Sequence, residues 1–91
     1  MIVRLRVIFS GRVQGVFFRA NTQRFASSLG VCGWVRNTDE GDVEAVFEGE
    51  EEAVKEVIRK CQYEQPYARV EKVQMFREEP KGDLKGFVIR Y

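Results

Sequence analysis

Apolar residues recur at helical spacing in some segments of this chain and at strand spacing in others. The order of these segments restricts the fold more than any other feature. Helical spacing of apolar residues occurs over 18–29 and 50–62, and strand-like patterns occur over 2–10, 31–37, 43–48, 69–77 and 86–91. The first strand is the clearest, because its apolar residues from Val3 to Phe9 alternate with Arg4 and Arg6. The chain therefore mixes half-buried strands with two amphipathic helices.

In chain order these elements are strand, helix, strand, strand, helix and strand, with a short closing piece. This order predicts an α+β fold of the ferredoxin-like type, an α/β sandwich (βαββαβ) whose antiparallel sheet carries two helices on one face. The polar stretch 38–42 predicts a hairpin loop, and Pro80 to Gly82 predict a turn before the last strand. With 91 residues, of which 44% are hydrophobic, we expect one domain over 1–91.

Charge is distributed unevenly along the chain. Residues 1–38 contain six arginines and no lysine, aspartate or glutamate, which gives this part a net charge of +6. Residues 39–91 contain nine basic and fourteen acidic residues, a net charge of −5. The first part of the sequence is therefore expected to attract a small anion.

The cysteines and the apolar runs indicate the compartment. No apolar run approaches the ~20 residues of a membrane span, and the N-terminal residues lack the core of a signal peptide. Cys32 and Cys61 are better explained as small buried hydrophobes than as a disulfide pair. We therefore expect a cytoplasmic protein that does not contact membranes.

The segment 11–19, GRVQGVFFR, has the features of an anion-binding loop that leads into a helix. Gly11 and Gly15 allow close backbone approach, so that successive N–H groups can converge on phosphate oxygens. The first helix has no acidic residue in its opening turns, whereas the second begins with three glutamates. Arg19 would add a planar guanidinium matched to two phosphate oxygens. Taken alone, these residues would also fit an ordinary strand-to-helix turn.

Two longer motifs resemble the signatures of the acylphosphatase family: 11–19, and 33–43 (GWVRNTDEGDV) followed by Gly49. The resemblance extends over essentially the whole chain. It implies hydrolysis of the carboxyl–phosphate bond of small acyl phosphates to a carboxylate and inorganic phosphate. It further implies that Arg19 and loop backbone amides bind the phosphate and that Asn37 orients the attacking water. The binding loop it implies comprises Arg12, Val13, Gln14, Gly15, Val16, Phe17 and Phe18, and Thr22 would have a supporting role.

The chemistry of the chain agrees with an acyl phosphate substrate. Histidine is absent, and the two cysteines have no metal-ligand spacing, so we expect neither a metal nor any other cofactor. Without a metal or an activated nucleophile, difficult phosphate esters are unsuitable substrates. An acyl phosphate is easier to cleave, because its leaving carboxylate has a pKa near ~4 to 5 and departs without a general acid.

The sequence leaves two interpretations open for several aromatic and basic side chains. Phe17 and Trp34 fit either a pocket entrance for an acyl group or the hydrophobic core, and the core is the commoner place for aromatic residues. Arg12 and Arg36 fit either anion steering or solvated positions at strand ends. Cys61 and Cys32 each lack the arginine six residues later that a thiolate phosphatase requires.

Two other function classes compete with the enzyme. The same cradle could hold a phosphorylated ligand without hydrolysing it, as a binding or regulatory module. The run 85–91, KGFVIRY, superficially resembles an aromatic RNA-binding motif, but it lies on the last strand with the wrong spacing. We therefore expect a monomer whose partners are a small acyl phosphate and its inorganic phosphate product, with no nucleic acid.

Overall fold

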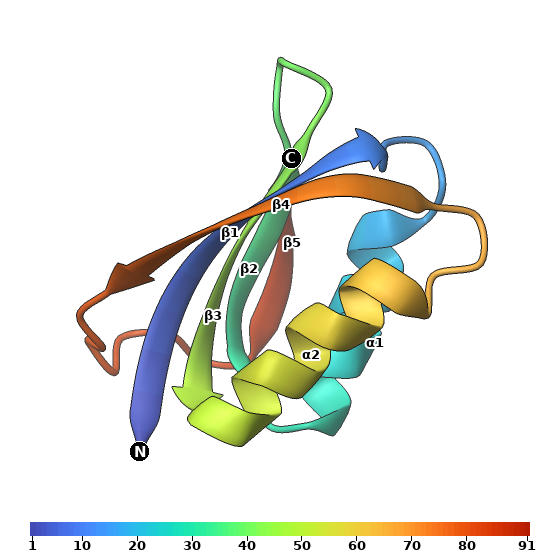
Figure 1. The fold of residues 1–91 in the computed structure, drawn as a ribbon. Helices are drawn as coiled ribbons and strands as arrows, with labels where there is room; N and C mark the ends of the chain where they lie inside the picture. The colour runs from blue at the N-terminus through green and yellow to red at the C-terminus, as the bar shows by residue number, and fades with distance from the viewer.

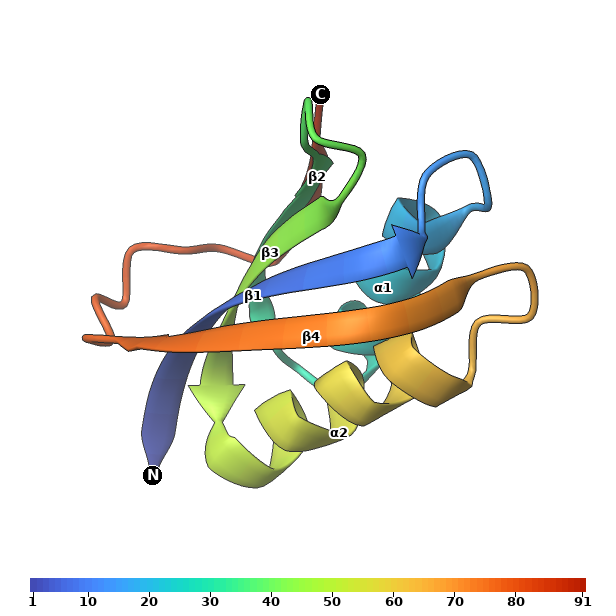
Figure 2. The same ribbon diagram turned by 45° about the horizontal axis from the view of Figure 1, so that its top comes forward.

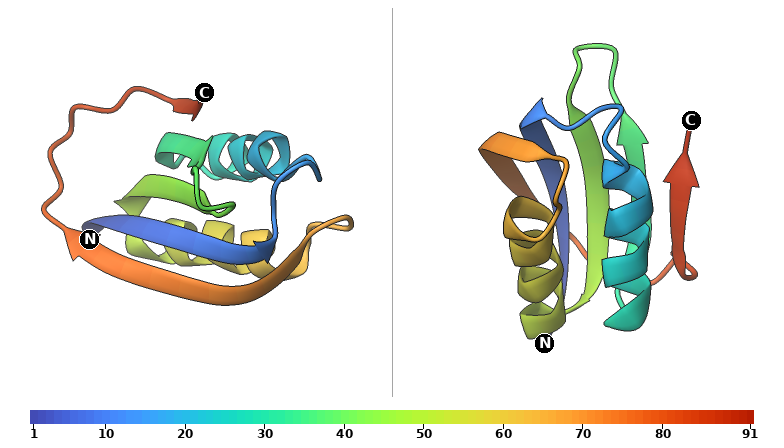
Figure 3. Two further views of the ribbon diagram at one scale, coloured as in Figure 1. Left: turned by 90° about the horizontal axis from the view of Figure 1, so that it is seen from above. Right: turned by 90° about the vertical axis from the view of Figure 1, so that its right-hand side faces the viewer.

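The computed structural model describes all residues, 1–91 (Figure 1). Its elements in chain order are β1 (Ile2–Arg12), α1 (Phe18–Ser28), β2 (Cys32–Asn37), β3 (Val43–Glu50), α2 (Glu51–Tyr63), β4 (Arg69–Glu78) and β5 (Phe87–Arg90). The strands form one sheet in the order β4-β1-β3-β2-β5, and both helices cover the same face of it (Figure 3). None of the helices is long and apolar enough to cross a bilayer.

The predicted ferredoxin-like arrangement is confirmed for the first six elements, while the closing strand differs from the antiparallel prediction. The pairs β1–β3, β1–β4 and β2–β3 are antiparallel, but β5 pairs with β2 in parallel. The cause lies in residues 79–86, which do not form a local turn. They cross from β4 at one sheet edge to the other edge (Figure 2). Since β4 ends where β2 begins, a strand that starts there runs in the direction of β2.

The core lies between the helices and the sheet, as the periodicity predicts. Phe9 of β1 packs on Phe18 of α1, with ring centroids 5.1 Å apart. Phe47 of β3 stacks on Phe87 of β5 at 5.5 Å, which fixes the closing strand to the same core. The helices contribute the residues spaced along their apolar faces: Phe18, Phe25, Ala26, Val54, Val57, Ile58 and Cys61. Both predicted helices are thus amphipathic elements docked on one sheet face.

The sheet face opposite the helices, here called the open face, carries an ion cluster centred on Arg4. Arg4 is buried, with 8% of its surface exposed. Its guanidinium lies 3.2 Å from Glu48, 3.1 Å from Glu78 and 3.1 Å from Asp83. The Glu48 carboxylate also accepts hydrogen bonds from the main-chain N–H groups of Lys81 and Gly82, at 3.2 and 2.9 Å. The cluster therefore anchors the crossing segment 79–86 to the sheet.

The charge contrast between the two parts of the sequence is partly cancelled by this sheet pairing. Arg6 lies 3.2 Å from Glu44, and Arg36 lies 2.7 Å from the same carboxylate, so with Arg4 three of the six early arginines are paired. The pairing of Arg36 favours its structural interpretation over anion steering. No ion pair of the protein involves Arg12 or Arg19. Of the three early arginines without an ion pair, Arg12 and Arg19 therefore lie at the two ends of the loop 12–19, and Arg24 lies on α1.

We expect Glu48→Gln to lower the free energy of unfolding by about 2 kcal/mol at pH 7. This is less than the ~3–5 kcal/mol for breaking a buried pair, because Arg4 keeps Glu78 and Asp83 as partners when the Glu48 charge is removed. Burial alone would raise the pKa of Glu48, but the bonds from Lys81, Gly82 and Arg4 outweigh it and hold that pKa below its usual value. The contribution is therefore complete above the carboxyl's ordinary pKa and is lost as the pH falls through its lower native pKa.

Urea unfolding of the wild type and Glu48→Gln, at pH 7 and at pH 3, measures this effect. The difference between the two proteins should shrink at the lower pH. Glu79→Gln, at an exposed position that makes no ion pair, is the control and should stay within ~0.5 kcal/mol of the wild type. An equal loss from Glu48→Gln at both pH values would show that the carboxylate charge does not stabilise the cluster.

Candidate active site

The loop between β1 and α1 has the backbone geometry of an anion-binding concavity. Gly15 and Phe17 both have positive φ angles, 74° and 63°, on either side of Val16. Alternation of left- and right-handed residues turns neighbouring N–H groups toward one point, where an anion can accept them. The N-terminus of α1 has no side-chain cap and no acidic residue in its first turn. The first turn of α1 therefore supplies no negative charge to complement this helix end.

Phe17 is the only residue other than glycine with a positive φ angle in the chain. A bulky residue in this conformation is strained, and such strain is concentrated at functional sites. Phe17 is 72% exposed, and its ring meets that of Tyr67 edge-on, with centroids 6.3 Å apart. Phe17 thus belongs to the rim of the pocket rather than to the core. Trp34 is different: it does not line the pocket, and Arg90 covers its ring at 4.6 Å.

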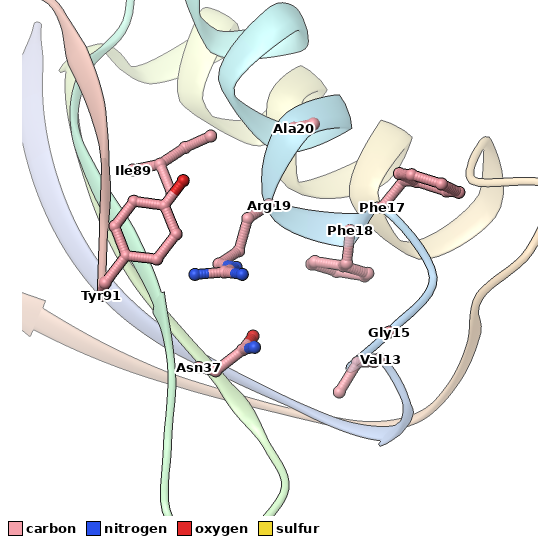
Figure 4. Close-up of a pocket in the computed structure, with 9 residues that line it drawn as sticks. All are labelled: Val13, Gly15, Phe17, Phe18, Arg19, Ala20, Asn37, Ile89 and Tyr91. Atoms are coloured by element: carbon pink, nitrogen blue, oxygen red, sulfur yellow. The ribbon is translucent and has the colours of Figure 1, made fainter.

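A pocket of about 290 Å³ lies between the loop, α1 and the ends of β2 and β5. It is lined by Val13, Gly15, Phe17, Phe18, Arg19, Ala20, Asn37, Ile89 and Tyr91. The side chains of Arg19, from α1, and Asn37, from the last position of β2, point toward each other across it (Figure 4). The pocket therefore combines a cation, a neutral amide and loop main-chain groups, with no carboxylate side chain among its lining residues.

The closing strand positions the guanidinium of Arg19. Its Nη1 donates a hydrogen bond to the Arg90 carbonyl oxygen at 3.2 Å, and its Cζ lies 4.8 Å from the centre of the Tyr91 ring. Figure 4 shows Tyr91 and Ile89 along the wall beside Arg19. The sequence did not predict these pocket residues. Nothing in the local pattern of 86–91 indicates that this strand lies beside β2, because that pairing is non-local.

Comparison with known proteins agrees with this geometry. The family model described as Acylphosphatase matches residues 5–89. An acylphosphatase of Rubrobacter xylanophilus is 55% identical over 87 residues, which cover 96% of this chain and 79% of the relative. The chain belongs to the acylphosphatase family. The crystal structure of an acylphosphatase from Bacillus subtilis superposes with a TM-score of 0.92 at 33% identity and covers 100% of both chains. One from Coxiella burnetii gives 0.89 at 34% identity, covering 98% of this chain and 93% of the other.

The remaining loop residues of this acylphosphatase divide into buried and exposed positions. Val13, Val16 and Phe18 are buried in the core, and of these three Val13 and Phe18 also line the pocket. Arg12 is exposed at the end of β1 and is not among the lining residues. The Gln14 side chain also does not line the pocket, since it donates hydrogen bonds to the β2–β3 hairpin.

Thr22 lies behind the loop, fully buried between the two helices. Its Oγ1 donates to the Phe18 carbonyl oxygen at 2.8 Å and accepts from Gln65 Nε2 at 3.3 Å. The Sγ of Cys61 lies 3.3 Å from the same oxygen. Burial raises the pKa of the Cys61 thiol to about 12, so this sulfur stays protonated at neutral pH and is not a nucleophile. Both cysteines are free thiols.

Proposed function

We propose that this acylphosphatase holds the phosphoryl group of a small acyl phosphate with Arg19 and the main-chain N–H groups of residues 13–18. In this proposal Asn37 orients the attacking water. The observation that carries it is the convergence of Arg19 and Asn37, from two separate elements, on the pocket beside the loop. A planar guanidinium and backbone donors suit phosphoryl oxygens, whereas an amide offers the donors and acceptor that hold water.

The proposed reaction is a single displacement at phosphorus. Water held by Asn37 attacks, the bond between phosphorus and the carboxyl oxygen breaks, and the carboxylate leaves with the bonding electrons. A phosphoryl oxygen of the substrate takes the water proton, so no general base from the protein is required. The leaving group needs no proton, because a carboxylate has a pKa near ~4 to 5. The protein contributes orientation and charge stabilisation at the transferring group.

We expect inorganic phosphate to inhibit the hydrolysis of benzoyl phosphate competitively, because the product and the phosphoryl end of the substrate would occupy the same cradle. Activity should also survive a strong chelator, since the mechanism uses no metal ion. Initial rates at several substrate and phosphate concentrations, with and without ethylenediaminetetraacetate, measure both effects. Noncompetitive inhibition or loss of activity on chelation would count against the mechanism. Phosphate binding without turnover would favour the binding module instead.

We further propose that residues 1–91 act as one monomeric domain in the cytoplasm, without a nucleic-acid partner. The paired arginines of the open sheet face support the last point. Arg4, Arg6 and Arg36 each lie within 3.2 Å of a carboxylate oxygen, so they are poorly suited to bind a phosphodiester backbone. Strong, salt-dependent affinity for RNA would contradict this part of the proposal.

A further inference from the structure

The sheet divides at the end where the pocket lies. The pairing of β1 with β3 ends at Phe9 and Val43. Beyond that point β1 continues with β4 alone, to the pair Arg12 and Arg69, after a register shift at Ser10 and Gly11. Figure 2 shows the β2–β3 hairpin and the β1–β4 ribbon separating at this end. The loop between β1 and α1, here called the phosphate loop, follows the β1–β4 ribbon. Asn37 is the last residue of β2, in the β2–β3 hairpin.

One side chain bridges this division. Gln14, in the loop after β1, donates from its Nε2 to the carbonyl oxygens of Thr38 and Asp42, both at 2.9 Å. A primary amide nitrogen has two hydrogens, so both donors of Gln14 are used. The contact joins the loop directly to the hairpin turn that begins one residue after Asn37.

The turn that Gln14 holds is closed by its own hydrogen bonds. The Thr38 N–H donates to the Asp42 carbonyl oxygen at 2.9 Å, and the Gly41 N–H donates to the Thr38 carbonyl oxygen at 3.2 Å. The Thr38 hydroxyl oxygen accepts from the Asp42 N–H at 3.1 Å. The turn therefore moves as a unit, and a contact at both of its ends fixes the adjoining Asn37 as well.

We propose that Gln14 is a positioning residue, which sets the distance of the Asn37 amide from the phosphate loop. This inference rests on the proposed role of Asn37. Glutamine suits the task because it combines two donors with enough length to cross the division between the ribbons. Glutamate has the same length without the donors, and asparagine has the donors but is one methylene shorter. Misplacement of a water-orienting group by about 1 Å can cost ~100-fold in rate.

Gln14→Met removes both donors and leaves the length and neutrality of the side chain nearly unchanged. We expect kcat for benzoyl phosphate to fall about tenfold, whereas the inhibition constant of inorganic phosphate changes less than about twofold. The two readouts separate because phosphate binding depends on Arg19 and the loop amides, while turnover also requires Asn37. Gln74→Met is the control and should keep nearly the wild-type kcat, since Gln74 is exposed on β4 and does not line the pocket.

A double-mutant cycle gives the sharper test. If Gln14 acts through Asn37, Gln14→Met added to Asn37→Ala should cause less than about a twofold further loss of kcat. Gln14→Lys keeps a hydrogen-bond donor and should retain more activity than Gln14→Met. This comparison distinguishes loss of the donor from misfolding of the variant. Additive losses, or weakened phosphate binding in Gln14→Met, would overturn this inference alone. Full activity of Asn37→Ala by itself would instead remove the proposed function and this inference together.

Discussion

Arg19→Gln should lower kcat/KM for benzoyl phosphate by about a thousandfold. Arginines that stabilise the charge on a transferring phosphoryl group are worth ~10³ to 10⁵ in rate. The glutamine amide has no charge and cannot reproduce the two parallel donors of a guanidinium. Arg19 makes no ion pair, and its one hydrogen bond is to the Arg90 carbonyl oxygen, so the fold should depend little on it. Steady-state kinetics and a thermal melt of the same sample separate the two effects.

The matched control for Arg19→Gln is Arg24→Gln on the same helix. Arg24 is exposed, lies against the Phe25 ring at 5.5 Å, and does not line the pocket. Arg24→Gln should keep nearly full activity. Arg19→Lys provides a second comparison, because it restores the charge without the fork and should recover only part of the loss. Wild-type turnover by Arg19→Gln would remove the guanidinium from the mechanism.

Asn37→Ala should lower kcat by about a hundredfold or more and leave the inhibition constant of inorganic phosphate nearly unchanged. The amide lies at the end of β2 and faces the pocket opposite Arg19. Without this amide the attacking water would lose its orientation, while the charges that bind the phosphoryl group would stay unchanged. Initial-rate kinetics with benzoyl phosphate, together with phosphate inhibition, give both quantities on one preparation.

Asn21→Ala is the control for the amide substitution. Asn21 lies on α1 outside the pocket, and its Nδ2 is 3.4 Å from Gln65 Oε1, so its replacement tests only a remote polar contact. It should retain most of the wild-type kcat. If Asn37→Ala weakened phosphate binding as strongly as it lowered kcat, the amide would be a phosphate ligand and the water-orienting role would be wrong.

Local chemistry explains which parts of this molecule the sequence could predict. The alternation from Val3 to Phe9 and the helical spacing after Phe18 each reflect one element packing on one core, so both appear in a short window. Gly15 and the missing acids of α1 are similarly local, because they concern the backbone of the loop and the end of the helix it enters. These features were sufficient to predict the fold type, whereas for the loop they left an ordinary strand-to-helix turn open beside the anion-binding interpretation.

Contacts between distant segments explain the rest. The pairing of Arg4 with Glu48 depends on the register of β1 on β3, which no local pattern of either strand specifies. The parallel placement of β5 depends on the route of residues 79–86 around the sheet edge. The direction of the Gln14 side chain depends on where the hairpin ends, and the motif alone suggested a phosphate-binding position for it.

The position of β5 makes catalytic competence more fragile than the fold. This strand has four residues, lies at a sheet edge and carries one wall of the pocket. Short edge strands detach at a smaller free-energy cost than global unfolding. A molecule whose last strand has transiently detached would keep most of its buried apolar residues but lose the support behind Arg19. In the proposed mechanism, which requires Arg19 at the phosphoryl group, the fraction of time that β5 stays docked therefore sets an upper limit on the fraction of molecules able to turn over substrate.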